Sequence, residues 1–260
     1  MLYRGMDRAQ LDAAYNNSAA VPERAAIVAG WAARSAGVRR EYAGRLDLAY
    51  GETPCERLDL FLAADPDAPT LAFIHGGYWQ INDLVKESFA FFAEGVLPLG
   101  INLAVIEYTL APVARLERIV AEVRRSVRWL AEHLAEYGAD PRRLYVAGHS
   151  AGGHLTAMTM PLSEVRGGIA ISGIYDLEPI RLNYLNEKLG LDMAKLKRDM
   201  ASAEVKREID ETRALATKLG IQGTPHFLVG DRVIPGAPEN LLEQMRKHVV
   251  EVRKEGCKVC

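Results

Sequence analysis

The sequence predicts an α/β fold, built as a mostly parallel sheet with helices on both faces. Apolar runs of strand length alternate with helical patterns through the middle of the chain. Two of the runs, Thr70–Ile74 and Ile101–Tyr108, are continuous enough to be buried on both faces of a sheet. Because strand–helix–strand alternation requires crossover connections, the strands are expected to lie parallel.

Composition excludes several classes of protein. The chain has 260 residues, of which 49% are hydrophobic and 25% charged, so it is long enough for one large domain or two small ones. A formal net charge of -2 argues against nucleic-acid binding. Charged residues occupy the N-terminus where a signal peptide needs an apolar core, and no stretch approaches the roughly 18 apolar residues of a membrane span. We therefore expect a cytoplasmic protein that does not bind membranes.

The first elements form a lead-in to the sheet. Residues Asp7–Ser35 have apolar side chains at helical spacing, with Pro22 opening a second helical segment. Leu46–Tyr50 and Glu56–Leu62 then alternate like strands on either side of a turn that contains Gly51 and Pro54. This pattern predicts an antiparallel hairpin ahead of the parallel strands.

The middle of the chain continues the alternation of strands and helices. Leu116–Tyr137 is an amphipathic helical pattern that ends at Gly138. An apolar, β-branched run from Leu144 follows, breaks at a glycine, and restarts as a helix after Ser150. Val165–Gly173 predicts one further strand.

Ser150 stands at the break between strand and helix, inside Gly148-His-Ser-Ala-Gly152. Glycines on both sides allow a sharp turn that bulkier side chains would obstruct, and such a turn projects the serine oxygen from the sheet edge. The following helix N-terminus carries unpaired N–H groups that favour negative charge. The pattern predicts a nucleophilic serine.

A second glycine motif follows the strand at Thr70–Ile74, in His75-Gly-Gly-Tyr-Trp79. Paired glycines at a strand end let backbone N–H groups point into a cleft without side chains in the way. The amides of Gly76, Gly77 and Ala151 could together form an oxyanion hole.

These motifs, with Tyr108-Thr-Leu-Ala-Pro112 and Ser172-Gly-Ile-Tyr-Asp176, resemble bacterial kynurenine formamidase and related α/β-hydrolase esterases over about residues 1–190. The resemblance implies that Ser150 is the nucleophile, that the three amides form the oxyanion hole, and that Tyr78 and Trp79 border the substrate pocket. It also implies acyl transfer to water through an acyl-serine, on a small ester or N-formyl aryl amide, with no cofactor and no metal.

The hydrolase pattern breaks after Leu189. Hydrolases of this kind need an acidic residue and then a histidine on later strands, but the chain instead becomes a charged helical region that runs to Leu219. Two short strands follow around Gly230-Asp231, and a final helix runs from Pro238 to about Lys254.

Residues 191–260 resemble the C-terminal part of DsbA-type, thioredoxin-like oxidoreductases, with Gly223-Thr-Pro225 as the loop that carries a cis proline. The redox C-x-x-C of that family lies in a part that is absent here. Cys257 and Cys260 at the chain end lack an activating helix N-terminus and supply only half a zinc site, so we interpret them as a solvated tail.

Two interpretations of this junction remain open. The chain is either a chimera of two protein families, or its C-terminal segment partly replaces the missing hydrolase elements. In the second case Asp231 would stand in for the acid, and His226 or His248 for the base. We expect an impaired hydrolase, with a thiol–disulfide oxidoreductase remnant or a non-catalytic fusion as alternatives. Because both parts lack partners for buried surfaces, marginal stability or homo-oligomerisation is also expected.

Overall fold

The computed structural model describes residues 1–189, 198, 201–218, 220–221 and 226–256. The chain falls into two compact units: a first unit, Met1–Leu191, and a second unit, Asp192–Cys260.

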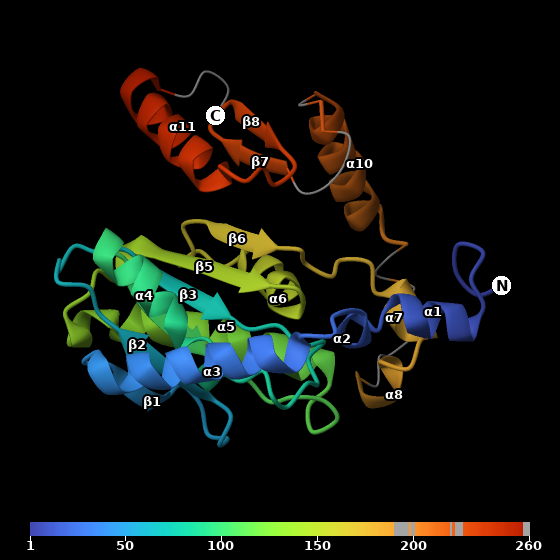
Figure 1. The fold of residues 1–260 in the computed structure, drawn as a ribbon, viewed down its shortest axis with the longest axis horizontal. Coiled ribbons are helices and arrows are strands. Elements are labelled where there is room, and N and C mark those ends of the chain that lie inside the picture. The colour runs from blue at the N-terminus through green and yellow to red at the C-terminus, as the bar shows by residue number, and fades with distance from the viewer. Residues whose placement is uncertain (190–197, 199–200, 219, 222–225, 257–260) are drawn as a thin grey trace. The chain divides into compact units, whose positions relative to one another are not determined.

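The first unit contains all the elements of the large sheet (Figure 1). Its α-helices are α1 Arg8–Ala14, α2 Asn17–Ala20, α3 Arg24–Glu41, α4 Ala93–Val96, α5 Leu116–His133, α6 Ala151–Thr159, α7 Glu178–Leu182 and α8 Asn186–Leu189. Its strands are β1 Arg45–Ala49, β2 Arg57–Phe61, β3 Thr70–Ile74, β4 Asn102–Ile106, β5 Leu144–His149 and β6 Gly168–Ile171. Short 3₁₀ turns are η1 Lys86–Ser88, η2 Ala90–Phe92, η3 Leu97–Leu99, η4 Leu134–Tyr137 and η5 Pro141–Arg143.

The six strands form one sheet in the order β1-β2-β4-β3-β5-β6. The first two strands make the predicted hairpin, and β2 runs antiparallel to β4. The four strands β4, β3, β5 and β6 are parallel, as predicted from the strand–helix alternation. The carboxyl ends of β3, β5 and β6 therefore meet along one edge of the sheet.

Helices cover both faces of this sheet (Figure 1). Alternate strand residues, such as Ile74 and Ile106, pack with α5 and α6 in one hydrophobic cluster. The residues between them, such as Phe73 and Val105, pack with Val38 of α3 and the aromatic side chains of the η2 turn in a second cluster. This two-sided burial explains why the strands have continuous apolar sequences.

The N-terminal lead-in differs in detail from the prediction. It forms three helices rather than two, because Asn16 caps a separate short turn: its side chain accepts a hydrogen bond from the Ala19 amide at 3.2 Å. The third helix begins two residues after Pro22 and extends to Glu41, beyond the predicted end at Ser35.

The described residues of the second unit include α10 Ala203–Lys218, β7 His226–Val229, β8 Arg232–Pro235 and α11 Leu241–Glu255. The two strands pair antiparallel around Gly230, as predicted, and α11 contacts both of them. The proposed cis-proline loop, Gly223–Pro225, and the two C-terminal cysteines lie outside the described residues.

Candidate active site

Ser150 occupies a strained turn between β5 and α6. Its backbone has φ 57° and ψ -118°, a conformation that non-glycine residues rarely adopt. Its N–H donates a hydrogen bond to the Ile171 carbonyl at 2.8 Å, which fixes the turn against β6. The flanking glycines are required sterically: a Cβ at Gly148 would lie 2.3 Å from the Gly152 carbonyl oxygen, and one at Gly152 would lie 2.0 Å from the Ile74 carbonyl oxygen.

The second glycine motif lies directly beside this turn. Because β3 and β5 are parallel neighbours, with Ile74 opposite Gly148, their carboxyl-terminal loops leave the sheet together. A Cβ built on Gly76 would come within 3.3 Å of the Ser150 Cβ, and Gly77 has φ 107°. Within the described residues, the amides of Gly76, Gly77 and Ala151 donate no hydrogen bond. These N–H groups are free to bind an oxygen near Ser150.

A buried histidine–glutamate pair supports the glycine loop. His75 is fully buried, with Nε2 2.8 Å from Glu107 Oε1 and Nδ1 2.9 Å from the Gly76 carbonyl oxygen. Its ring stacks on Tyr108 at a centroid distance of 4.4 Å. Burial alone would lower the pKa of His75, but the charge and hydrogen bond of Glu107 outweigh it and raise the pKa. The imidazole is thereby held between Glu107 and the Gly76 carbonyl, where it can orient the Gly76 peptide.

Two cavities open on Ser150. The first, of about 500 Å³, is mainly apolar and aromatic. It is lined by Asn17, Ser18, Val21, Arg24, Ile27, Val28, Trp31, Phe73, Gly76, Gly77, Tyr78, Ile81, Leu84, Phe89, Phe91, Phe92, His149, Ser150 and Ile171. Its one charged side chain, Arg24, is bound through both terminal nitrogens to Asp83 at 2.8 and 2.9 Å. This cavity can hold an aryl or alkyl group next to the serine.

The second cavity, of about 370 Å³, is more polar. It lies at the carboxyl ends of β5 and β6 and is lined by Tyr15, Asn17, Tyr78, His149, Ser150, Ser172, Gly173, Ile174, Tyr175 and Asp176. The two cavities share Asn17, Tyr78, His149 and Ser150, so a molecule bound over the serine can occupy both.

The two residues predicted to border the substrate pocket lie in different surroundings. Tyr78 lines both cavities, and its hydroxyl accepts a hydrogen bond from Asn17 Nδ2 at 3.2 Å. Trp79 does not border either cavity: it is fully buried, and its ring packs edge-on against His154 at 5.2 Å. The backbone at both residues has positive φ, which turns the neighbouring side chains in different directions.

Among the described residues of the first unit, no base is held against Ser150. Among the described residues, no side chain hydrogen-bonds the Ser150 hydroxyl. His149 lines both cavities, and burial lowers its pKa. Burial lowers the pKa of His154 to about 4, and this residue packs in the core.

The three candidate acid and base residues all belong to the second unit. Asp231 is in the β7–β8 turn, with its carboxylate 3.9 Å from the Arg232 guanidinium. His226 begins β7, and its side chain is outside the described structure. His248 on α11 has Nδ1 3.1 Å from the Glu251 carboxylate. Asp231 and His248 share no hydrogen bond, so the described residues of this unit do not assemble an acid–base pair from them.

Several residues that line the cavities belong to no motif or periodic pattern that would identify them from the sequence. Asn17 comes from the N-terminal lead-in, far from either glycine motif. Phe91 and Phe92 belong to the short 3₁₀ segment η2, and Phe89 immediately precedes it; this stretch has no strand or helix periodicity. Their contribution depends on tertiary packing, whereas the other side of the second cavity comes from the motif Ser172–Asp176.

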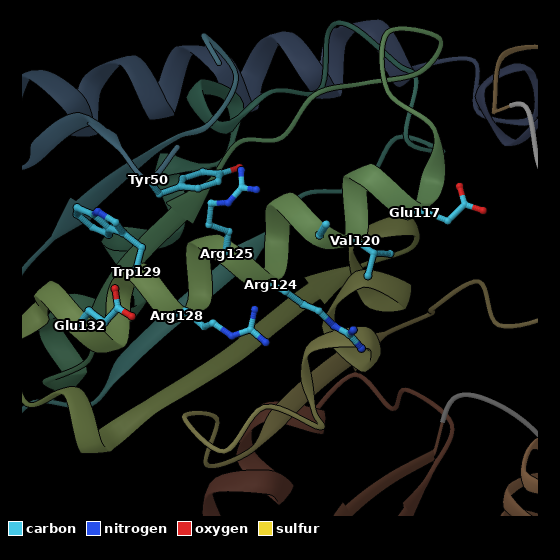
Figure 2. A pocket seen from close by; sticks show the side chains of 9 residues that line it. Tyr50, Glu117, Val120, Arg124, Arg125, Arg128, Trp129 and Glu132 are labelled. Carbon is cyan, nitrogen blue, oxygen red and sulfur yellow. The ribbon is translucent and has the colours of Figure 1, made fainter. Parts of the chain in front are cut away.

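A groove along α5 is a poorer candidate for a site. Arg124, Arg125 and Arg128 project from this helix (Figure 2). Each already has a partner: Arg124 donates to the Met158 carbonyl at 2.7 Å, Arg125 pairs with Glu56, and the Arg128 Nε lies 4.0 Å from Glu164. The residues lining the groove include no serine, cysteine or histidine nucleophile.

Metal and membrane sites are equally unsupported by the described chain. Among its described residues, no group of three or more His, Cys, Asp and Glu side chains could hold a metal ion. None of its described helices is long and apolar enough to cross a membrane.

Comparisons with known proteins agree with this geometry. The BD-FAE family matches residues 58–181, and the DSBA-like thioredoxin domain family matches residues 173–249. The second match begins inside the first unit and ends before Cys257. Kynurenine formamidases from Danio rerio and Salmo salar are 36% and 35% identical over 154 residues, which are 55% of this chain and 50% of each relative. The chain therefore spans about half the length of these curated relatives.

A solved structure supports the fold over a larger part of the chain. A protein from Silicibacter sp., provisionally assigned as a thioesterase, is 32% identical, covers 72% of both chains and has a TM-score of 0.64. This chain belongs to the α/β-hydrolase family of esterases and kynurenine formamidases, and a DSBA-like thioredoxin segment forms its C-terminal part.

Proposed function

We propose that the chain is a serine hydrolase acting on a small ester or N-formyl aryl amide through an acyl-serine intermediate. The observation that carries the proposal is the position of Ser150: it occupies a strained turn beside three free backbone amides and opens on two cavities. Its relatives named kynurenine formamidase favour an aryl amide, and the aromatic cavity has the chemistry to accept an aryl group.

In this reaction the Ser150 oxygen bonds to the substrate carbonyl carbon and gives its proton to a base. The amides of Gly76, Gly77 and Ala151 stabilise the negative charge that develops on the carbonyl oxygen. The leaving group departs with a proton, and water then hydrolyses the acyl-serine.

We propose that turnover is impaired, because no acid or base is found against Ser150 among the described residues of the first unit. An oxyanion hole and binding alone retain about 10³–10⁴-fold catalysis over water when a catalytic triad is lost. Asp231, His226 and His248 remain the candidates to complete the triad.

A fluorophosphonate probe tests the proposal, because it reacts covalently with activated serines. The folded protein is expected to be labelled at one site, slowly compared with an intact esterase, and Ser150→Ala should abolish labelling. Asp65→Asn, in an exposed loop, is the matched control and should be labelled like wild type. Absence of labelling in folded wild-type protein, or undiminished labelling of Ser150→Ala, would show that the proposal is wrong.

Variants of the second unit test the completion of the triad. If His226→Ala, His248→Ala and Asp231→Asn all label at the wild-type rate, the site works without these residues and the hydrolase is impaired as proposed. A loss of more than about 10³-fold in any one of them would instead identify a triad member.

A further inference from the structure

The second cavity beside Ser150 differs from the first in charge. Of the residues that line it, Asp176 is the only one with a formal charge at neutral pH, because burial lowers the pKa of His149 and keeps its ring neutral. The apolar cavity, by contrast, contains a cation, Arg24, that is already neutralised by Asp83. The two sides of the serine therefore present different environments to a substrate.

The Asp176 carboxylate is fixed in place by two hydrogen bonds. Its Oδ2 accepts from the Tyr3 hydroxyl at 2.7 Å, and its Oδ1 accepts from the Glu178 amide at 3.0 Å. An ionised carboxylate has about four acceptor positions, so capacity remains for a further donor. Within the described structure no lysine or arginine forms a salt bridge with it, and the neighbouring Arg4 lies over the Tyr3 ring, 5.2 Å from its centroid.

Aromatic side chains line the same cavity as this exposed carboxylate. Tyr15, Tyr78 and Tyr175 line the same cavity, and burial raises the pKa of each hydroxyl, that of Tyr78 to about 12. Their phenols therefore stay neutral and add no competing charge. Neutral aromatic rings next to a carboxylate favour ammonium groups, since the faces of the rings attract cations.

We propose that the second cavity is a subsite for a positively charged amine on the substrate, and that Asp176 determines this preference. The proposal rests on the proposed function, because it places the amine relative to Ser150 as the nucleophile. The substrate class is then an ester or amide whose apolar group lies in the first cavity and whose ammonium group lies in the second.

Protection from fluorophosphonate labelling tests the subsite with a matched pair of small molecules. Choline carries a quaternary ammonium, and 3,3-dimethylbutanol is its neutral carbon analogue of the same shape. Choline is expected to slow labelling of Ser150 at a concentration about tenfold lower than that of 3,3-dimethylbutanol. The difference is the added affinity expected from one exposed ion pair and cation–π contacts.

Substitutions separate the charge of Asp176 from its structural role. Asp176→Asn should remove the preference for choline, whereas Tyr3→Phe removes one hydrogen bond but keeps the charge and should retain the preference. Circular dichroism and the labelling rate without ligand verify that both variants are folded. Equal protection by the two molecules in wild type, an unchanged preference in Asp176→Asn, or a loss in Tyr3→Phe as large as in Asp176→Asn would overturn the proposal.

Failure of the proposed function can be recognised separately. If folded wild-type protein is not labelled at all, Ser150 is not an activated nucleophile, and calorimetric titration with choline then tests the subsite directly. Binding of choline to wild type that is lost in Asp176→Asn supports the subsite, and absence of binding to wild type overturns it.

Discussion

At the scale of single residues, the site depends on groups buried behind it. Glu107 is an example, because its carboxylate receives hydrogen bonds from His75, from the Lys86 amide at 2.8 Å and from the Tyr108 amide at 3.0 Å. These bonds hold one end of the loop that carries Gly76 and Gly77. The support is electrostatic, so it is expected to depend on pH.

The pKa shifts of this pair determine the pH range of its effect. Burial opposes the charged form of each group, but their mutual attraction prevails: the pKa of Glu107 is lowered and that of His75 is raised. The His75 contribution to stability is complete below its unfolded pKa of about 6.5 and is lost as the pH rises through the folded value. The Glu107 contribution is present above about 4.5 and is lost as the pH falls through its lowered folded value.

Removing the charge of Glu107 should therefore destabilise the protein most near pH 6. We expect Glu107→Gln to lower the free energy of unfolding by about 3 kcal/mol at that pH, as for other broken buried ion pairs, and by less at pH 9. Glu94→Gln is the control, because Glu94 pairs with Arg34 at 2.5 Å on the surface. This substitution should lower the free energy of unfolding by less than about 1 kcal/mol. Urea denaturation at the two pH values measures both effects; equal losses for the two variants would contradict the assignment.

At the scale of elements, the strand–turn–helix around Ser150 is an example of local sequence that determines local structure. Only glycine fits at Gly152, because the backbone of β3 passes within contact distance of the helix start, and only glycine fits at Gly148, because the Gly152 carbonyl lies against it. The strands, the antiparallel hairpin at the N-terminus and the hairpin at Gly230 were predictable for the same reason: periodicity and turn residues act over short distances.

The turn gives a direct steric prediction. Gly152→Ala should destabilise the first unit by at least about 2 kcal/mol or prevent its folding, because the new methyl group meets the main chain of β3, which cannot move aside like a side chain. Gly95→Ala, in α4 with no atom within 4 Å of its added Cβ, should be neutral or slightly stabilising. Thermal melts followed by circular dichroism compare the two; a wild-type melting temperature for Gly152→Ala would contradict the model of the turn.

The parts of the site that sequence did not predict are those assembled across long distances in the chain. Asn17 and Tyr15 reach the serine from the lead-in helices, and no local pattern marks them. The family resemblance implies that Trp79 borders the pocket, yet its side chain is buried and packs edge-on against His154, in a loop where its backbone has φ 59°. Direction of a side chain in a strained loop depends on tertiary packing, which periodicity does not encode.

At the scale of the whole molecule, the two units differ in how much apolar surface they bury. The first unit contains two hydrophobic clusters, one on each face of its sheet. Among the described residues of the second unit, Ile234 is the one buried hydrophobic side chain, and α11 buries none. Burial of apolar surface is the main stabilising contribution to a fold, so the second unit should be the less stable.

Native-state hydrogen exchange can measure this difference within the intact chain. Amides of β3, β4 and β5 are expected to exchange only through global unfolding of the first unit, whereas those of β7, β8 and α11 should exchange at least about 100-fold faster, because a unit with little buried apolar surface opens at a lower free energy. Ile234→Ala should accelerate exchange in the second unit and leave the first sheet unchanged, since it removes the buried side chain of that unit alone. Equal protection of both units in wild type would contradict this expectation. So would an acceleration of β3 to β5 exchange in Ile234→Ala as large as that of α11, because the chain would then unfold as one cooperative body.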